Sequence, residues 1–311
     1  MRHTLTLGRL FDIRVGVHAS WIAVFAFITI SIAGNIEGVS QVAALGLAAV
    51  CAVLLFTCVI AHEFAHALVA RRYGVRTTSI VLFLFGGVAT LECEPPSPRA
   101  EVTIALAGPL MSALLAGTAF GALMLLERWA GGPLGEGVRL VAAYLALANG
   151  VLAVFNLVPA FPMDGGRVLR AAVWQARHSR AAATGAASIV GLVLAAALIG
   201  TGVVAAVLLH AWQEGWYVLI GGFLLRQSWL QFRDSRYIER LERVRVSDVM
   251  EAAGAGDVAA DGFSLASSAS ALDAVSAFRT SDRTQIAVVD AGHLSGWLRR
   301  EHMFEILDRA A

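Results

Sequence analysis

Long apolar stretches are the feature of this chain that most restricts its fold. Of its 311 residues, 58% are hydrophobic and only 15% are charged, a balance too apolar for a soluble domain of this length. Six segments are long enough, or nearly so, to cross a hydrocarbon core of about 30 Å at about 1.5 Å per residue. They cover residues 19–34, 44–69, 101–126, 139–160, 184–209 and 214–231. We therefore expect an all-α polytopic membrane protein of about six transmembrane helices.

The basic residues predict how these spans are oriented. All of them are arginines, and they gather in residues 2–14, 71–99, 167–180 and 233–245, whereas the opposite connections carry only Arg128. Because positive residues accumulate in cytoplasmic connections, we expect a multi-pass protein of the cell membrane with both termini cytoplasmic. The net charge of +1 gives no reason to expect nucleic acid as a partner.

Residues 75–98 interrupt the helical pattern between the second and third spans. β-Branched and aromatic residues come first, the pair Gly86-Gly87 suits a turn, and a proline cluster ends the stretch. We predict a short β-hairpin partly embedded in the membrane, which must line a protein cavity because lipid does not tolerate open strand edges. The alternative is a surface hairpin that lies at the membrane interface.

The character of the chain changes after the sixth apolar segment. We divide it into a membrane domain (residues 1–235), a helical linker (236–245) and a small α/β domain on the cytoplasmic side (246–311). In this last domain we expect a helix in the ALDAVSAFR stretch, a strand at QIAVVD, a turn at Ala291-Gly292 and a closing helix from about Arg299.

The strongest chemical signal is the H-E-x-x-H pattern of His62, Glu63 and His66, near the cytoplasmic end of the second span. Residues four apart lie on one face of a helix, so both imidazoles can reach one zinc ion, with Glu63 beside the metal-bound water as general base. Ionisable residues within a membrane helix are costly unless they have a function. The pattern therefore predicts a zinc site.

Catalytic zinc usually has three protein ligands and a water, so a third ligand is needed. The fourth span ends at Asn156, and Pro159 and Pro162 then break the helix just before Asp164 and two glycines. The second and fourth spans both end at the cytoplasmic face, so Asp164 can reach the depth of the two histidines. We predict that His62, His66 and Asp164 hold one Zn²⁺ per chain.

Together these motifs resemble the site-2 protease family of intramembrane zinc metalloproteases. The resemblance covers most of the first 235 residues and rests on His62–His66, Asn156, Pro159, Pro162, Asp164, Gly165, the Phe85–Ala89 stretch and Ala107–Pro109. It implies cleavage of transmembrane or membrane-associated proteins near the cytoplasmic leaflet, such as a transcription regulator or its inhibitor. It also implies that Asn156 helps to hold the substrate or its oxyanion.

A helical substrate must unwind before its backbone can be cut. We expect the edge of the Val81–Leu91 hairpin to pair with the unwound segment as an added strand. Gly86, Gly87 and Pro162 are the candidate substrate contacts. His18, at the entry to the first span, is interpreted as an interfacial anchor rather than a ligand. Membrane lipid is the other expected partner.

Residues 246–311 resemble a single cystathionine β-synthase (CBS) repeat. The similarity lies in Val246–Met250, Ile286–Asp290 and Gly296–Leu298. Such repeats work in pairs, which implies a homodimer through this domain. Arg299 and His302 stand where the family has the side chains that bind the ribose and phosphate, which argues against adenine nucleotide.

Two alternatives to a protease remain at this point. The first is a catalytically silent, zinc-containing membrane scaffold or sensor, against which the presence of Glu63 argues, since a binding-only site needs no general base. The second is a metal-ion transporter, which would require polar residues at mid-membrane on several spans.

Overall fold

A computed structural model of the chain describes residues 4–83, 86–129, 132–208, 210, 215–254, 264–281 and 283–301. Its helices are α1 (Ser20–Ala33), α2 (Gln41–Arg72), α3 (Pro98–Trp129), α4 (Gly132–Asn156), α5 (Asp164–Arg177), α6 (Arg180–Leu208), α7 (Gly215–Arg243) and α8 (Ala271–Thr280). Its strands are β1 (Thr4–Leu10), β2 (Ile13–His18), β3 (Thr77–Phe83), β4 (Gly86–Leu91), β5 (Glu251–Ala252), β6 (Ser264–Leu265), β7 (Gln285–Asp290) and β8 (His293–Arg299).

Four helices are long and apolar enough to cross a membrane, namely α2, α3, α4 and α6. They coincide with the second to fifth predicted spans and support a multi-pass membrane protein. The first predicted span is α1, an apolar helix of 14 residues and so about 21 Å long. The sixth lies in α7, which is not one of the four.

Local sequence explains where the helices begin and end. The Ser40 hydroxyl accepts a hydrogen bond from the Ala43 amide and caps α2, and Gly74 follows that helix at φ 75°. The Ser97 hydroxyl accepts from the Ala100 amide, and Pro98 is the first residue of α3, where a missing N–H costs nothing. The fourth span begins and ends earlier than predicted, because α4 starts at Gly132 and already ends at Asn156.

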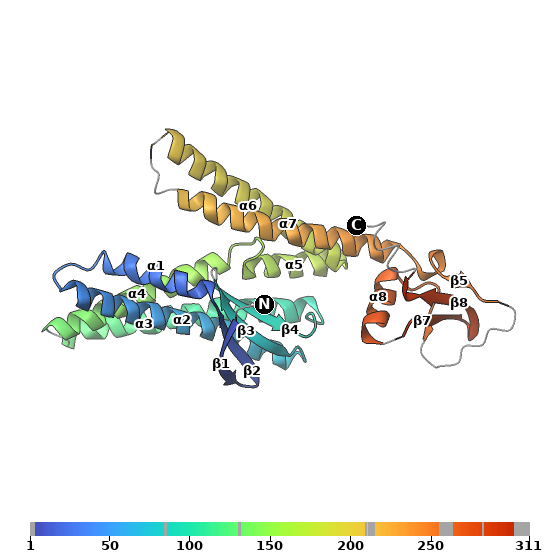
Figure 1. Cartoon of the computed structure of the whole chain (residues 1–311), viewed down its shortest axis with the longest axis horizontal. Coiled ribbons are helices and arrows are strands. Elements are labelled where there is room, and N and C mark those ends of the chain that lie inside the picture. The colour runs from blue at the N-terminus through green and yellow to red at the C-terminus, as the bar shows by residue number, and fades with distance from the viewer. Residues whose placement is uncertain are drawn as a thin grey trace.

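A four-stranded sheet of order β1-β2-β3-β4 lies at one end of the α1–α4 bundle (Figure 1). The predicted hairpin is confirmed as the antiparallel pair β3–β4, but Gly86 and Gly87 open β4 instead of forming the turn. Residues 84–85 lie outside the described residues. The hairpin β1–β2 was not predicted, and β2 runs parallel to β3. The membrane domain is therefore not all-α.

The sheet packs against α2 beside the H-E-x-x-H motif. In β2 alternate residues point to one face, and Ile13, Val15 and Val17 are all buried. Ile13, Val15 and Ile80 form a cluster with Phe64 of α2. Val17 packs against Phe56, which precedes Phe64 by eight residues on the same helix. The sheet is thus fixed along the histidine-bearing end of α2.

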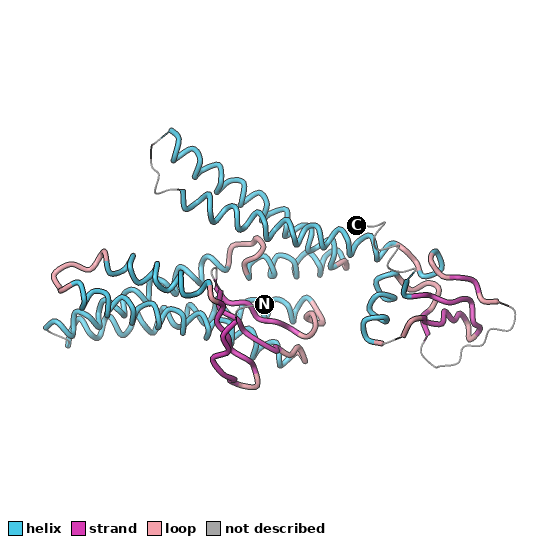
Figure 2. Tube along the Cα trace, in the orientation of Figure 1, coloured by secondary structure: helices cyan, strands magenta, loops and turns pink. Residues whose placement is uncertain are grey.

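The short helix α5, between α4 and α6, was not predicted as an element. It contacts α3 on one side and α6 on the other, and α6 and α7 form a long antiparallel pair above it (Figures 1 and 2). Ala160 and Met163, in the loop before α5, are buried against Ala195 and Leu224 of that pair.

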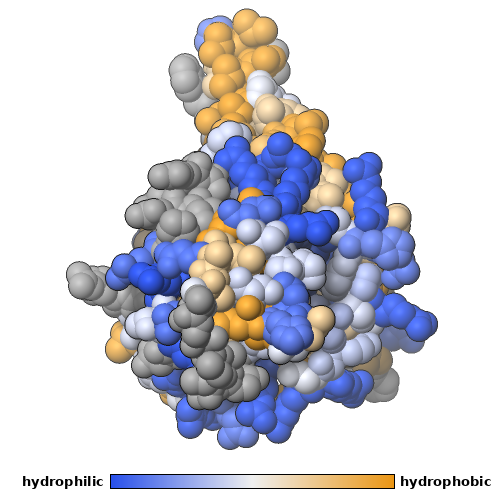
Figure 3. Space-filling view, turned by 90° about the vertical axis from the view of Figure 1, so that its right-hand side faces the viewer, coloured by the Kyte–Doolittle hydropathy of each residue, from blue (hydrophilic) through white to orange (hydrophobic). Residues whose placement is uncertain are grey.

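The C-terminal residues form a separate α/β unit with the sheet order β5-β8-β7-β6. The predicted helix and strand are confirmed as α8 and β7, and Ala291 and Gly292 form the turn at positive φ. The predicted linker is the last part of α7, whose Leu241 is buried in this unit's core. The closing helix falls largely outside the described residues. Figure 3 shows the molecule from the side of this C-terminal unit. The surface of this side is mostly hydrophilic, while apolar residues gather at the top, on the end of the α6–α7 pair.

Candidate metal centre and active site

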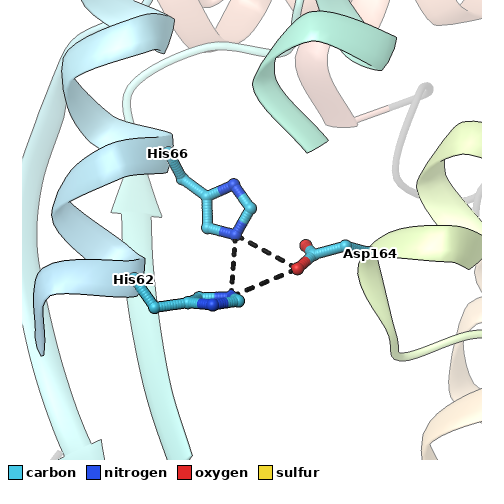
Figure 4. Close-up of side chains that lie close together, drawn as sticks. All are labelled: His62, His66 and Asp164. Carbon is cyan, nitrogen blue, oxygen red and sulfur yellow. Dashed lines mark hydrogen bonds and ion pairs between the residues drawn. The ribbon is translucent and has the colours of Figure 1, made fainter. Parts of the chain in front are cut away.

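The two histidines of α2 converge as their spacing predicts. His62 and His66 are only 4% and 7% exposed, and their Nε2 atoms lie 3.1 Å apart. Both side chains point away from the α2 axis into the same buried space (Figure 4).

Asp164, the first residue of α5, faces this pair. Its Oδ2 atom lies 3.3 Å from His62 Nε2 and 3.2 Å from His66 Nε2 (Figure 4). Its other oxygen, Oδ1, lies 4.0 Å from Arg167 Nη1. The three predicted ligands therefore meet at one point, and among the described residues they form the one group suited to hold a metal ion.

The geometry of the three ligand atoms fits a zinc ion. With Zn–N and Zn–O distances of about 2.0–2.1 Å, the ligand atoms of a tetrahedral site lie about 3.3 Å apart. The observed separations of 3.1, 3.2 and 3.3 Å agree with this value. Three protein ligands are also the number typical of a catalytic zinc site, in which water or substrate takes the fourth position.

The outer ring nitrogens support the same assignment. His66 Nδ1 donates to the Ile104 carbonyl oxygen at 2.7 Å, so the neutral ring presents its Nε2 lone pair to the site. His62 Nδ1 lies 2.8 Å from the Ser112 hydroxyl and donates to it in the same tautomer. Ile104 and Ser112 belong to α3 and were not predicted as part of the site.

Gly108 of α3 leaves room for the metal. A Cβ at this position would overlap His66 Nε2 and His62 Nε2, the two nitrogen atoms that would bind the ion. The sequence showed Gly108 only through the resemblance of Ala107–Pro109 to the family. The residues Ile104, Gly108 and Ser112 are four apart and therefore lie on one face of α3, but nothing in their types marks this face as the one turned to the site.

The two glycines after Asp164 permit the close backbone approach that the sequence indicated. A Cβ on Gly165 would overlap the carbonyl oxygens of Leu157 and Val158, and one on Gly166 would overlap the backbone at Ala160. The first turn of α5 therefore lies directly on the loop that follows α4. This contact sets where Asp164 emerges.

A hydrogen bond from α7 fixes the same loop. The Ser228 hydroxyl donates to the Phe161 carbonyl oxygen at 2.9 Å, and Ser228 is fully buried. Gly191 of α6 lies directly beside this bond, because a Cβ there would overlap both partners. The α6–α7 pair thus holds the residues just before Asp164.

Asp164 lies where a cation would stabilise its ionised form. Its buried carboxylate faces the Nε2 atoms of both histidines, so a bound metal ion would be the positive charge to which all three groups are directed.

Glu63 lies between the candidate metal ligands and strand β4. Its side chain fills the space in which a Cβ of Gly87 would lie, and it is only partly buried. It interacts electrostatically with His62, His66 and Asp164. This is the position expected of a general base next to a metal-bound water.

Asn156, Pro162 and His18 are not part of the group formed by the three candidate ligands. The Asn156 side-chain amide donates to the Leu152 carbonyl oxygen at 3.0 Å, within its own helix. Pro162 is exposed in the loop that leads to Asp164. His18 Nδ1 lies 2.9 Å from the Ser20 hydroxyl, at the start of α1, and is not part of the metal group.

Comparison with known proteins agrees with this geometry. The family model described as "Peptidase family M50" matches residues 50–129 and 129–199, the part of the chain that carries all three ligands and Glu63. Residues 50–199 are therefore similar to peptidase family M50, and they are called the M50 domain below. This similarity agrees with the predicted site-2-type zinc metalloprotease.

Individual relatives carry the same assignment. The chain is 33% identical over 255 residues to "Putative zinc metalloprotease sll0528" of Synechocystis sp.. This alignment covers 80% of this chain and 65% of the relative. It is 38% identical over 257 residues to "Putative zinc metalloprotease Rip3" of Mycobacterium tuberculosis, covering 81% and 64%. The chain thus spans slightly less than two thirds of the length of both relatives.

A solved structure resembles most of this chain. The "Site-2 Protease from Methanocaldococcus jannaschii" aligns with a TM-score of 0.52 and 28% identity, over 74% of this chain and 96% of that one. The chain therefore shares the overall architecture of a site-2 protease over that part of its length.

Proposed function

We propose that this protein is an intramembrane zinc-dependent endopeptidase that cuts transmembrane or membrane-associated proteins near the cytoplasmic side. The observation that carries the proposal is the meeting of His62, His66 and Asp164 within 3.3 Å, with Glu63 beside them. A zinc ion bound there would supply a polarised water and a Lewis acid for the scissile carbonyl.

The protein's own groups divide the remaining work. Glu63 accepts the proton of the attacking water and then delivers it to the leaving amine. The Asn156 amide donates to the substrate or its oxyanion, which requires that it leave the Leu152 carbonyl to which it is bonded without substrate. Ile104 and Ser112 hold the two imidazoles in the tautomer that faces the metal.

The substrate binds as a strand added to β4. In the order β1-β2-β3-β4, β4 is an edge strand, and its Gly87 lies against Glu63. A segment paired along this edge would pass beside Glu63, and Gly86, where an added Cβ would meet no atom within 4 Å, would leave space for its backbone. Pro162, exposed in the loop before Asp164, remains a proposed substrate contact. Prolines introduced one at a time at positions 88–90 should stop cleavage, and intact cleavage in all three would contradict this binding mode.

Both termini are proposed to be cytoplasmic, with six crossings. In support, β2 precedes α1 and β3 follows α2, yet the two strands pair, so α1 and α2 leave one side and return to it. The long antiparallel pair α6–α7 would make the fifth and sixth crossings. Labelling of single cysteines placed at positions 6 and 250 in sealed membrane vesicles tests this topology.

The C-terminal unit is proposed to act as a single CBS-like module that pairs with the module of a second copy. Its β6–α8–β7–β8 order, with β6 parallel to β7, supports this assignment. Adenine nucleotide is not proposed as a ligand. A monomeric mass of the full-length protein in mild detergent would contradict the pairing.

The substrate class is proposed to be a membrane-tethered transcription regulator or its inhibitor. The test compares the membrane proteome of cells that contain the native protein with that of cells containing Glu63→Gln. Substrates should accumulate uncut in the variant, and cleavage of a purified substrate should fall by about 10²–10⁴-fold while zinc content stays at one per chain.

The rival function is a zinc-containing scaffold or sensor without proteolysis. It predicts identical proteomes for the native protein and Glu63→Gln, because both would bind zinc. If no membrane protein is cut in either strain, and zinc is bound to both the native protein and Glu63→Gln, the result would therefore favour the scaffold over the protease.

A further inference from the structure

One face of α3 contacts both histidines of the metal site and also carries a buried carboxylate. Glu101, Ile104, Gly108 and Ser112 follow one another at intervals of three, four and four residues, which places them on one side of the helix. Three of these positions contact the histidine pair directly, as described above. The fourth, Glu101, contacts none of the metal ligands.

Glu101 is a completely buried carboxylate. Its exposed fraction is 0%, and Arg170 of α5 donates to its Oε1 through Nε at 2.6 Å and through Nη2. Within the described part of the chain, its Oε2 has no hydrogen-bond partner. Arg170 is therefore the group that balances this charge, and a buried charge without such a partner would be strongly unfavourable.

Arg170 connects this carboxylate to the segment that carries Asp164. It lies on α5, the helix that Asp164 begins, and its guanidinium carbon stands 5.6 Å from the centre of the Phe161 ring. Phe161 belongs to the loop just before Asp164. Arg170 thus links α3 to the loop that leads into α5, at the point where Asp164 begins that helix.

Glu101 also shares a helical turn with a group that orients a histidine. Ile104, three residues further along α3, offers the carbonyl oxygen to which His66 Nδ1 donates. The same turn of α3 therefore holds His66 through a carbonyl and α5 through an ion pair. Any shift of α5 along α3 would change the distance between Asp164 Oδ2 and His66 Nε2, which is 3.2 Å.

We propose that Glu101 and Arg170 are positioning residues that set the distance between Asp164 and the histidine pair. The proposal rests on the zinc site proposed above and names a determinant of it outside the ligands themselves. The exposed partner of Arg170, Glu94, lies 3.7 Å away with a side chain 65% exposed, so solvent screens it and it contributes less.

The test measures metal binding instead of proteolysis. Full-length protein in detergent is stripped of metal, and zinc affinity is measured by competition with a chelator. The d–d absorption of bound Co²⁺ then reports whether the ligands are tetrahedral. Glu101→Gln and Arg170→Gln should each weaken zinc binding by about tenfold or more and reduce the tetrahedral Co²⁺ signal.

Further variants separate positioning from general stability. The double variant E101Q/R170Q leaves no unpaired buried charge. Its loss of zinc affinity should therefore be smaller than the combined losses of the two single variants. Arg170→Lys keeps the charge and should recover part of the affinity, and it carries the test if Glu101→Gln does not fold. Glu239→Gln removes a carboxylate paired with Arg236 and Arg243 on α7 and should leave zinc affinity unchanged.

Two outcomes overturn the proposal in distinguishable ways. If Glu101→Gln and Arg170→Lys melt at lower temperature but bind zinc and Co²⁺ like the native protein, the pair serves stability alone. If the native protein itself does not bind one zinc per chain, the proposed metal centre fails and this inference fails with it.

Discussion

The two sides of the metal centre are held in different ways. His62 and His66 lie on one long helix, four residues apart, and their outer nitrogens bond to α3. Asp164 instead follows a loop, and contacts from α3, α5 and α7 determine where it points. A single helix sets the histidine geometry, whereas the aspartate geometry depends on packing between segments far apart in the sequence.

This difference indicates which substitutions should lower the metal affinity on each side of the site. Metal affinity on the histidine side depends on space for the ion, because the helix already aligns the ligands. On the aspartate side it depends on the backbone path before α5. Substitutions that add one carbon at selected glycines can test the two sides separately.

The largest effect is expected from Gly108→Ala on the histidine side. The added Cβ would overlap both Nε2 atoms and occupy the place of the ion. Zinc content should fall from one per chain to about a tenth or less, with cleavage lost. Gly117→Ala, on the same helix with no atom within 4 Å of its new Cβ, is the matched control and should bind zinc normally.

A smaller effect is expected from Gly165→Ala on the aspartate side. The new Cβ would overlap the Leu157 and Val158 carbonyl oxygens and move the first turn of α5, so zinc affinity should fall by about 10–100-fold. Chelator competition measures this change. Gly150→Ala of α4, which meets no atom within 4 Å, serves as control. Equal zinc affinity in Gly165→Ala and the native protein would contradict the account of the loop.

The smallest effects compare two buried hydroxyls, one on each side. Ser112→Ala removes a hydrogen bond made directly to a ligand ring and should weaken zinc binding by about tenfold. Ser228→Ala removes a bond to the loop backbone at Phe161, where other contacts remain, and should weaken it by about threefold or less. The same chelator assay decides the order, and a larger loss in Ser228→Ala would reverse the comparison.

The sequence predicted that His62, His66 and Asp164 meet, because the signals for this are local or follow from topology. The four-residue spacing predicted that the two histidines converge, and the ends of the second and fourth predicted spans at one face predicted that Asp164 reaches them. The contacts of Ser112 and Glu101 depend on how α3 packs against α2 and α5, which no local pattern encodes. They become visible only once those helices are in place.

The fold was predicted less completely. The hairpin β1–β2 was missed because its turn uses Phe11 and Asp12 at φ 52° and 67°, without the glycine that marks such turns in a sequence. Gly86 and Gly87 gave a turn signal but serve in β4, where Gly87 makes room for Glu63. The polar helix α5 carries no long apolar run, so a search for spans passed over it.

X-ray absorption at the zinc edge of the full-length protein tests the central claim most directly. We predict one zinc bound by two imidazoles and light oxygen ligands, with one imidazole lost in His66→Ala and no sulfur at about 2.3 Å. A spectrum with a sulfur ligand from Cys51, Cys58 or Cys93, or with an unchanged imidazole count in His66→Ala, would show that the ion is not held by His62, His66 and Asp164.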